Sequence, residues 1–389
     1  MVLYISHFLS RYRQTKVMNE PNDEVDVKTS PYNNVFAPIL YVGIFWIIIT
    51  LSSWLLRSAI CWLFYNAKSS QTIKESTKNV IGFDIIPRRL KSINSWIYLD
   101  KQLTSNHQLL IILLDSIATI ELCACSLECW IIREAFGLWG FLIAIALNCI
   151  RSSLFISFDA NGSPCDPWYR FLLGQTQPIW MVFTWTLQLL SASIALKLCK
   201  YWWSLQMTAY HIARYKLALD MLDPQTLVNH TSDLQVVFTI GFLCEALGIF
   251  MDLYLNILFS CILENWNSKY SSGNLQKLPS MTLDEPTNSK VTNPHILTKK
   301  QLLTSYIVRL LINLTLIAYG LEWTGMYLNP ANAFIQSWHV GNTSSIHHII
   351  VYWFGPFCGI WLYVTLKQIT CECITKFIQH DKLTQLKHE

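Results

Sequence analysis

The residues of this chain best suited to chemistry are an Asn-Pro-Ala triplet at 329–331, between two long apolar segments. Pro330 has a fixed φ and no N–H, which suits the first position of a helix, and Asn329 precedes it as a capping residue. A helix that begins at membrane depth directs its positive end and free N–H groups at whatever lies there. Such a start is tolerated in a bilayer only where it is buried in protein or lines a watery cavity. The triplet, which ends at Ala331, therefore indicates a channel in which the Asn329 amide meets the solute.

A second helix start of the same kind occurs earlier, at Ser163-Pro164-Cys165, before an apolar stretch that is too short to cross a membrane. It occupies the place in its half of the chain that Asn329 and Pro330 occupy in the other half. The repetition predicts an inverted repeat with a site near the bilayer midplane. Asp166, which precedes a second proline, is expected to remain at this helix start as a local cap.

Acidic residues repeat as well, because Asp115 lies in the first span of one half and Glu245 in the first span of the other. A carboxylate at membrane depth costs about 2.5–3.5 kcal/mol on insertion scales, so a role is expected for each. We expect both to accept hydrogen bonds from the backbone of the loops before the half-helices. Other charged residues near the spans are expected to be span-end residues that reach the interface: Glu121, Glu128, Asp252, Arg309 and Glu322. Arg57 is expected to face a headgroup or the helix bundle.

Composition supports a membrane protein, with 52% hydrophobic and 14% charged residues and a mean hydropathy of +0.31. A soluble domain would carry roughly 25% charged residues. The net charge of +4 is modest and spread out, so no nucleic-acid partner is inferred. The 12 cysteines lie mostly in apolar runs and are expected to pack as small hydrophobes. No catalytic constellation, cofactor motif or metal-ligand spacing is recognisable, so no enzyme activity, cofactor or metal is expected.

Seven segments are long and apolar enough to cross a bilayer, which takes about 20 residues each: 37–60, 108–132, 137–157, 178–199, 235–262, 302–321 and 347–368. The first is not expected to be a cleavable signal peptide, because a polar stretch precedes it and no small-residue cleavage site follows. The spans divide the chain into a polar tail (1–36), an extra transmembrane helix (37–65), a basic linker (66–106), a first repeat (107–200) with a half-helix at 163–174, a connecting loop (201–233), a second repeat (234–370) with a flexible loop at 263–301 and a half-helix at 329–338, and a C-terminal tail (371–389).

The basic residues predict the orientation, because cytosolic loops carry an excess of Lys and Arg. The linker 66–106 and the loop 263–301 are both basic, which places them and the C-terminal tail in the cytosol. Asn229 and Asn342 begin glycosylation sequons, and both fall on loops that this topology assigns to the lumenal side.

In the order and spacing of these motifs, residues 107–370 resemble the aquaporin family, closest to its unorthodox aquaporin 11 and 12 type branch. Ser163-Pro164-Cys165 resembles the first signature of that branch with Ser in place of Asn, and Thr324-Gly325 followed by Asn329-Pro330-Ala331 matches the second. Other matching segments are the Cys-rich stretch from Asp115, Trp203 to His211, and Val351 to Gly359.

The resemblance implies an all-α membrane protein with an aquaporin-like inverted repeat: six core transmembrane helices and two re-entrant half-helices, here with one extra N-terminal transmembrane helix. It implies a pore at which the half-helices meet, with Asn329 as the second donor and Ser163 in the place of the first. The filter positions are occupied by Ile317 and by Asn332 in place of an Arg. A less polar, uncharged lining favours water, hydrogen peroxide or glycerol. The resemblance also implies a homotetramer and suggests an intracellular membrane such as the endoplasmic reticulum.

Two other interpretations remain open from the sequence. A non-conducting structural membrane protein of the same fold fits Ser163, Asp166 and the bulky neighbours Trp168 and Tyr169. A seven-span chemoreceptor fits the length and the number of spans, but it leaves Asn329-Pro330-Ala331 without a role.

Overall fold

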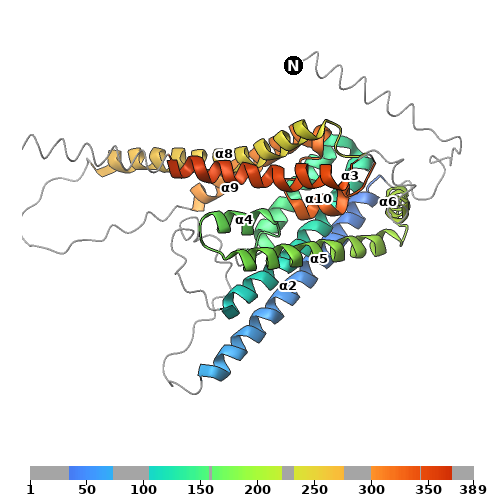
Figure 1. The fold of residues 1–389 in the computed structure, drawn as a ribbon, viewed down its shortest axis with the longest axis horizontal. Coiled ribbons are helices and arrows are strands. Elements are labelled where there is room, and N and C mark those ends of the chain that lie inside the picture. The colour runs from blue at the N-terminus through green and yellow to red at the C-terminus, as the bar shows by residue number, and fades with distance from the viewer. Residues whose placement is uncertain are drawn as a thin grey trace, which may run out of the picture.

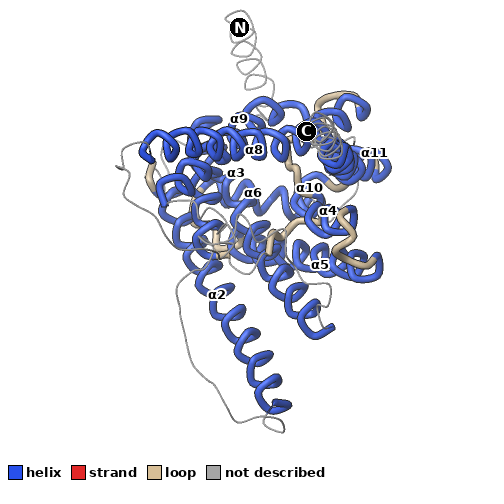
Figure 2. Tube along the Cα trace, turned by 90° about the vertical axis from the view of Figure 1, so that its left-hand side faces the viewer, coloured by secondary structure: helices blue, strands red, loops and turns tan. Residues whose placement is uncertain are grey.

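The computed structural model describes residues 35–72, 105–156, 160–220, 232–275, 299–341 and 343–369, and all of their regular secondary structure is helical (Figure 2). Six helices are long and apolar enough to cross a membrane. The described chain is therefore an all-α, multi-pass integral membrane protein, which confirms the class predicted from composition.

The second of these six helices, α3 (Ser105–Phe155), folds back on itself at Gly137, whose φ of 71° and ψ of −162° are not helical. The rings of Trp130 and Phe141 lie 5.2 Å apart, and Arg151 donates a hydrogen bond to Glu121. In a straight helix, residues 30 positions apart would be separated by about 45 Å. The two parts of α3 are therefore an antiparallel pair, and the six helices provide the seven span-length segments that the sequence predicts.

The first half of the bundle combines α3 with α4 (Cys165–Leu172) and α5 (Pro178–Trp203). The first part of α3 and α5 run parallel, because Asp115 contacts Gln188 and, further along both helices, Glu128 contacts Trp203. The buried faces of the two helices carry many alanines and cysteines, whose small side chains allow the backbones to approach closely.

The second half consists of α8 (Phe238–Leu275), α9 (Lys299–Thr324), α10 (Pro330–Ser337), α11 (Ser345–Ile349) and η3 (Ile350–Phe354), after which the last helix continues through residue 369. Figure 1 shows α8, α9 and the last helix side by side, with the short helices α4 and α10 between this group and α5. At Gly359 the last helix approaches α8 so closely that a Cβ would lie 2.1 Å from the Ala246 carbonyl oxygen.

An extra N-terminal helix, α2 (Ala37–Thr72), packs against α3 and projects beyond the other helices at its C-terminal end (Figures 1 and 2). It continues past the predicted limit at residue 65. The predicted loop 263–301 is wrong at both ends, because α8 continues to Leu275 and α9 begins at Lys299. No proline interrupts 263–275, so the helix continues from the apolar span into polar sequence.

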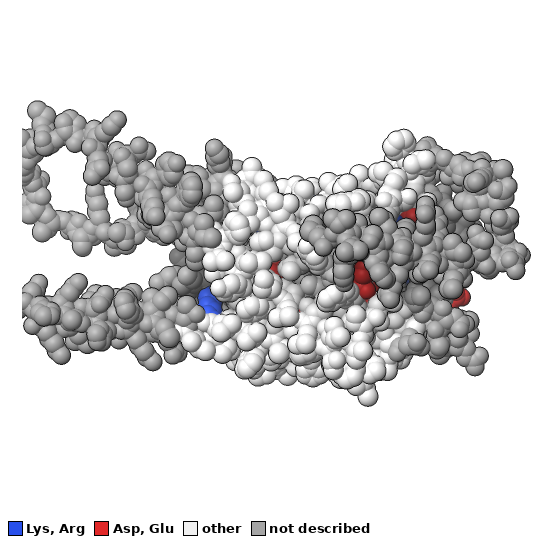
Figure 3. Space-filling model, turned by 90° about the horizontal axis from the view of Figure 1, so that it is seen from above, with Lys and Arg blue, Asp and Glu red and all other residues white. Residues whose placement is uncertain are grey.

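The outer surface of the described bundle is apolar. On the face seen in Figure 3, the described residues show few Lys, Arg, Asp and Glu side chains. Large apolar side chains project outward from most helices, among them Leu55, Trp139, Ile179 and Leu311. A lipid bilayer is the environment that suits this surface.

Candidate pore junction

The two short helices α4 and α10 begin in the same way. The Ser163 hydroxyl accepts a hydrogen bond from the backbone N–H of Cys165 (3.3 Å), and the side-chain oxygen of Asn329 accepts one from the N–H of Ala331 (3.0 Å). In both cases the acceptor lies two residues before the donor. Asn329 also accepts from the N–H of Asn332 at 3.4 Å, and it is the N-terminal cap of α10.

A buried carboxylate supports the loop before each half-helix. Asp115 accepts hydrogen bonds from the N–H groups of Asn161 and Gly162, both at 2.9 Å. Glu245 accepts from the N–H groups of Tyr327 (3.2 Å) and Leu328 (3.0 Å). These are the hydrogen bonds expected from the sequence.

The two carboxylate contacts are equivalent in position. The donors are the residues two and one before Ser163 in the first half, and two and one before Asn329 in the second. The acceptors Asp115 and Glu245 both lie in the first long helix of their half, α3 or α8. The two halves of the described chain thus build the same local arrangement twice.

The two loops are also joined to each other. The Asn329 side-chain amide donates to the carbonyl oxygen of Gly162 (3.1 Å), and the Cys165 thiol contacts the carbonyl oxygen of Leu328 (3.6 Å). Each of these carbonyls belongs to the residue directly before Ser163 or Asn329. The N-terminal ends of α4 and α10 therefore meet, so the positive ends of the two helix dipoles face a common region.

Three supporting residues were not predicted from the sequence. The Gln188 side chain donates to Asp115, and the Thr324 hydroxyl donates to Glu245 (2.7 Å). The Tyr352 hydroxyl, in the π-helical segment, donates to the Thr324 carbonyl oxygen (2.8 Å). All three are buried, so the carboxylates are held in place by a second layer of hydrogen bonds.

The loop before α10 has an unusual backbone. Gly325, Met326 and Leu328 have positive φ values of 78°, 47° and 51°, and the last two are not glycine. Each such non-glycine residue costs of the order of 1–3 kcal/mol and persists only where its surroundings over-determine it. The hydrogen bonds that the loop N–H groups donate to Glu245 and to the Thr324 hydroxyl provide that constraint here.

The predicted filter residues lie in different surroundings. The Asn332 amide donates to the Ser126 hydroxyl (3.0 Å) and accepts from the Gln336 amide (2.7 Å). Gln336 in turn accepts from the indole N–H of Trp130. Ile317 packs in an apolar cluster. Asn332 is thus part of an uncharged polar network between α3 and α10.

Asp166 does not cap α4, which corrects that expectation. The cap residue of α4 is Pro164, and Asp166 lies in the first turn. Its carboxylate pairs with Arg170 (2.7 Å) and accepts from the Asn161 side chain (2.8 Å). The Arg170 guanidinium therefore balances the negative charge of Asp166 one turn along the same helix.

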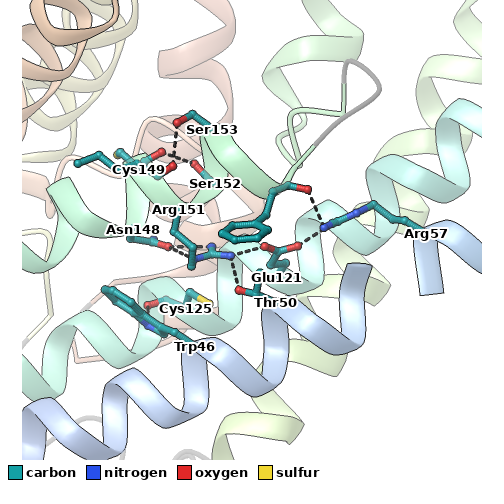
Figure 4. Close-up of polar contacts among 12 residues, drawn as sticks. Trp46, Thr50, Arg57, Glu121, Cys125, Asn148, Cys149, Arg151, Ser152 and Ser153 are labelled. Carbon is teal, nitrogen blue, oxygen red and sulfur yellow. Dashed lines mark hydrogen bonds and ion pairs between the residues drawn. The ribbon is translucent and has the colours of Figure 1, made fainter. Parts of the chain in front are cut away.

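The expectation that Glu121 and Glu128 are span-end residues is wrong, because both are fully buried. Figure 4 shows Glu121 between two arginines, Arg57 of α2 (2.6 Å) and Arg151 of the second part of α3. Arg57 also donates to the Phe155 carbonyl oxygen (3.1 Å). A charged group inside a bilayer is stable only when paired, and this cluster fastens α2 to α3.

Asp252 is buried as well, whereas Arg309 and Glu322 are exposed. Asn229 and Asn342, the predicted glycosylation positions, lie outside the described residues, as do residues 73–104 of the predicted linker and the tail from residue 370.

Comparison of the chain with models of known protein families and with curated proteins finds no match.

Proposed function

We propose that this protein is a membrane channel that passes water or small neutral solutes, such as hydrogen peroxide or glycerol, through a pore at the junction of α4 and α10. The observation that carries the proposal is the repeated arrangement at the junction: two opposed half-helix starts, each preceded by a loop held by a buried carboxylate. Irregular backbone at membrane depth is tolerated where it is buried in protein or lines a water-filled cavity, and transporter folds use such helix ends as binding sites.

The chemistry of the junction favours neutral solutes. Ser163, Cys165 and Asn329 are uncharged, and the nearby Asp166 is paired with Arg170. The positive ends of two helix dipoles disfavour cations, including protons. The resemblance to aquaporins supports the same conclusion, and we extend the proposal to a homotetramer in an intracellular membrane.

A non-conducting structural protein of the same fold is the second candidate. The hydrogen bonds that Asn332 makes to Ser126 and Gln336 favour it, because they join α3 to α10 through side chains that would otherwise be free to bind a solute. A seven-helix receptor gives the paired short helices no role.

The test is solute flux into sealed liposomes that contain the purified protein, measured by stopped-flow light scattering for water and by a trapped peroxide probe. Asn329→Asp keeps the helix cap but removes the amide that donates to Gly162 and adds a negative charge. We expect flux above that of empty vesicles, and a loss of at least tenfold in the variant.

Gln175→Glu is the matched control, because it makes the same amide-to-carboxylate change at an exposed position in the turn after α4. It should leave the flux unchanged. Flux equal to that of empty vesicles for both solutes would exclude the channel and favour the non-conducting candidate.

A further inference from the structure

Away from the junction, two buried side chains each have one polar atom without a hydrogen-bond partner. Glu128 of α3 and His211 of α6 (Ala209–Asp220) are both fully buried. The carboxylate Oε2 of Glu128 and Nε2 of His211 lie 3.8 Å apart, and neither atom has a hydrogen-bond partner among the described residues. The other carboxylate oxygen of Glu128 accepts from the Trp203 indole N–H (2.6 Å).

On the other side of the imidazole, Nδ1 has a partner that can accept its hydrogen. The Thr208 hydroxyl oxygen lies 2.6 Å from Nδ1 of His211 and accepts a hydrogen bond from the His211 backbone N–H. An oxygen that already accepts one N–H is suited to accept Nδ1–H as well. Nε2 then presents a lone pair to Glu128, and a lone pair facing an ionised carboxylate in a dry site is unfavourable.

Among the residues that the structure describes, no cation forms an ion pair with Glu128. Arg214 of α6 acts on it electrostatically, but its guanidinium lies 2.9 Å from Glu134. The other titratable groups that interact with the pair are thiols and a phenol: Cys125 and Cys129 of α3, Cys199 of α5 and Tyr41 of α2. An ionised Glu128 would leave an uncompensated charge in an apolar region, which is costly.

We propose that Glu128 and His211 form a buried proton-binding site, in which the Glu128 carboxyl carries the proton and directs it at Nε2 of His211. Burial lowers the pKa of His211 to about 4, so the imidazole is the acceptor and the proton stays on the carboxyl oxygen. One added proton removes the net charge and satisfies both unpartnered atoms.

The site connects to the polar network around Asn332. His211 and Arg214 lie one turn apart on α6, and the Arg214 guanidinium lies 5.3 Å from the centre of the Trp130 ring. The Trp130 indole donates to Gln336, which donates to Asn332. The docking of α6 on α3 therefore helps to position the residues that we place at the filter.

The direction of the pH effect follows from where the proton is held. A free glutamate or histidine side chain holds almost no proton above neutral pH, whereas the folded site holds one. Docking of α6 is therefore most favourable in mildly acidic solution, between about pH 4.3 and pH 6.5, where the free side chains and the folded site each hold one proton. It weakens as the pH rises through the titration of the site.

Infrared difference spectroscopy of the reconstituted protein tests the proton site without reference to transport. A carboxylic-acid C=O band should be present in the natural protein at neutral pH and disappear in Glu128→Gln, and it should shift in frequency in His211→Gln. Glu322→Gln, which changes an exposed carboxylate, should retain the band. Spectra of the natural protein and Glu128→Gln that are identical between about pH 5 and pH 9 would overturn the proposal.

If Glu128→Gln does not fold, hydrogen exchange of residues 209–220 in the natural protein tests the proton site instead. After correction for intrinsic rates, protection should decrease as the pH rises, and protection that is constant with pH would also overturn the proposal.

The connection between the proton site and the filter residue Asn332 rests on the proposed function. It predicts that flux depends on pH in the natural protein but not in Glu128→Gln. A Glu128-dependent infrared band without any flux would exclude the channel and leave the proton site intact.

Discussion

Among single side chains at the junction, Glu245 accepts three hydrogen bonds with its two oxygens, as Asp115 also does. In Glu245→Gln the new NH₂ group must face an N–H or O–H donor, which leaves a buried donor unsatisfied at a cost of about 1–3 kcal/mol. We expect a lower apparent Tm in detergent and a loss of flux. Glu322→Gln removes an exposed carboxylate and should change neither; equal melting of the two variants would contradict the role of Glu245.

Gly162 is needed for its conformation and for its lack of a side chain. Its φ is +62°, and a Cβ would lie 2.8 Å from Leu122 Cδ1 and 3.0 Å from the Ala118 carbonyl carbon. Gly162→Ala should therefore combine about 1–2 kcal/mol of left-handed strain with a comparable cost of overpacking. The test compares the thermal unfolding of Gly162→Ala with that of Gly174→Ala. At Gly174 φ is +69°, but a Cβ would have no atom within 4 Å. Equal destabilisation by the two substitutions would show that packing at Gly162 contributes little.

The supporting roles of Asp115 and Glu245 could be predicted from the sequence, because placing a carboxylate inside an apolar span costs free energy and therefore indicates a specific role. Gln188, Thr324 and Tyr352 could not, because such residue types occur in any helix and their partners lie far away in the chain. Their roles depend on which helix faces are brought together, and a single sequence does not contain that information.

Among the helices, α2 is the one whose attachment can be tested directly. Arg57 and Glu121 are 2% and 0% exposed. Arg57→Gln leaves Glu121 paired with Arg151 alone and should destabilise the protein by about 1–3 kcal/mol through the lost charge-assisted hydrogen bond. Arg133→Gln breaks a pair with 26% and 51% exposure and should cost at most about 1 kcal/mol. The apparent Tm values of the two variants show whether the buried ion pair contributes more to stability than the exposed one. A small effect of Arg57→Gln would mean that apolar packing alone holds α2 in place.

The positions of the long helices followed from apolar length, and those of both half-helices from proline placement, since Pro164 and Pro330 stand at the starts of α4 and α10 in the structure. The helix α6 was not predicted, because its sequence in the connecting loop has no apolar run of span length. The pairing of Glu121 with two arginines was also missed, because Arg57, Glu121 and Arg151 lie on segments that only the packing of α2 on α3 brings together.

For the chain as a whole, the fold-back at Gly137 has a consequence for topology. Within the described residues, six apolar helices, of which one crosses twice, give seven crossings, so the Ala37 end of α2 and the Ile369 end of the last helix should lie on opposite sides of the membrane. Epitope tags fused before residue 1 and after residue 389 test this in sealed microsomes treated with protease. The excess of Lys and Arg in 66–106 predicts that the C-terminal tag is digested and the N-terminal tag is protected. Equal digestion of both tags would require an even number of crossings. That result would exclude either the insertion of α2, which lies outside the inverted repeat, or the hairpin of α3, on which the inverted repeat and the proposed channel depend.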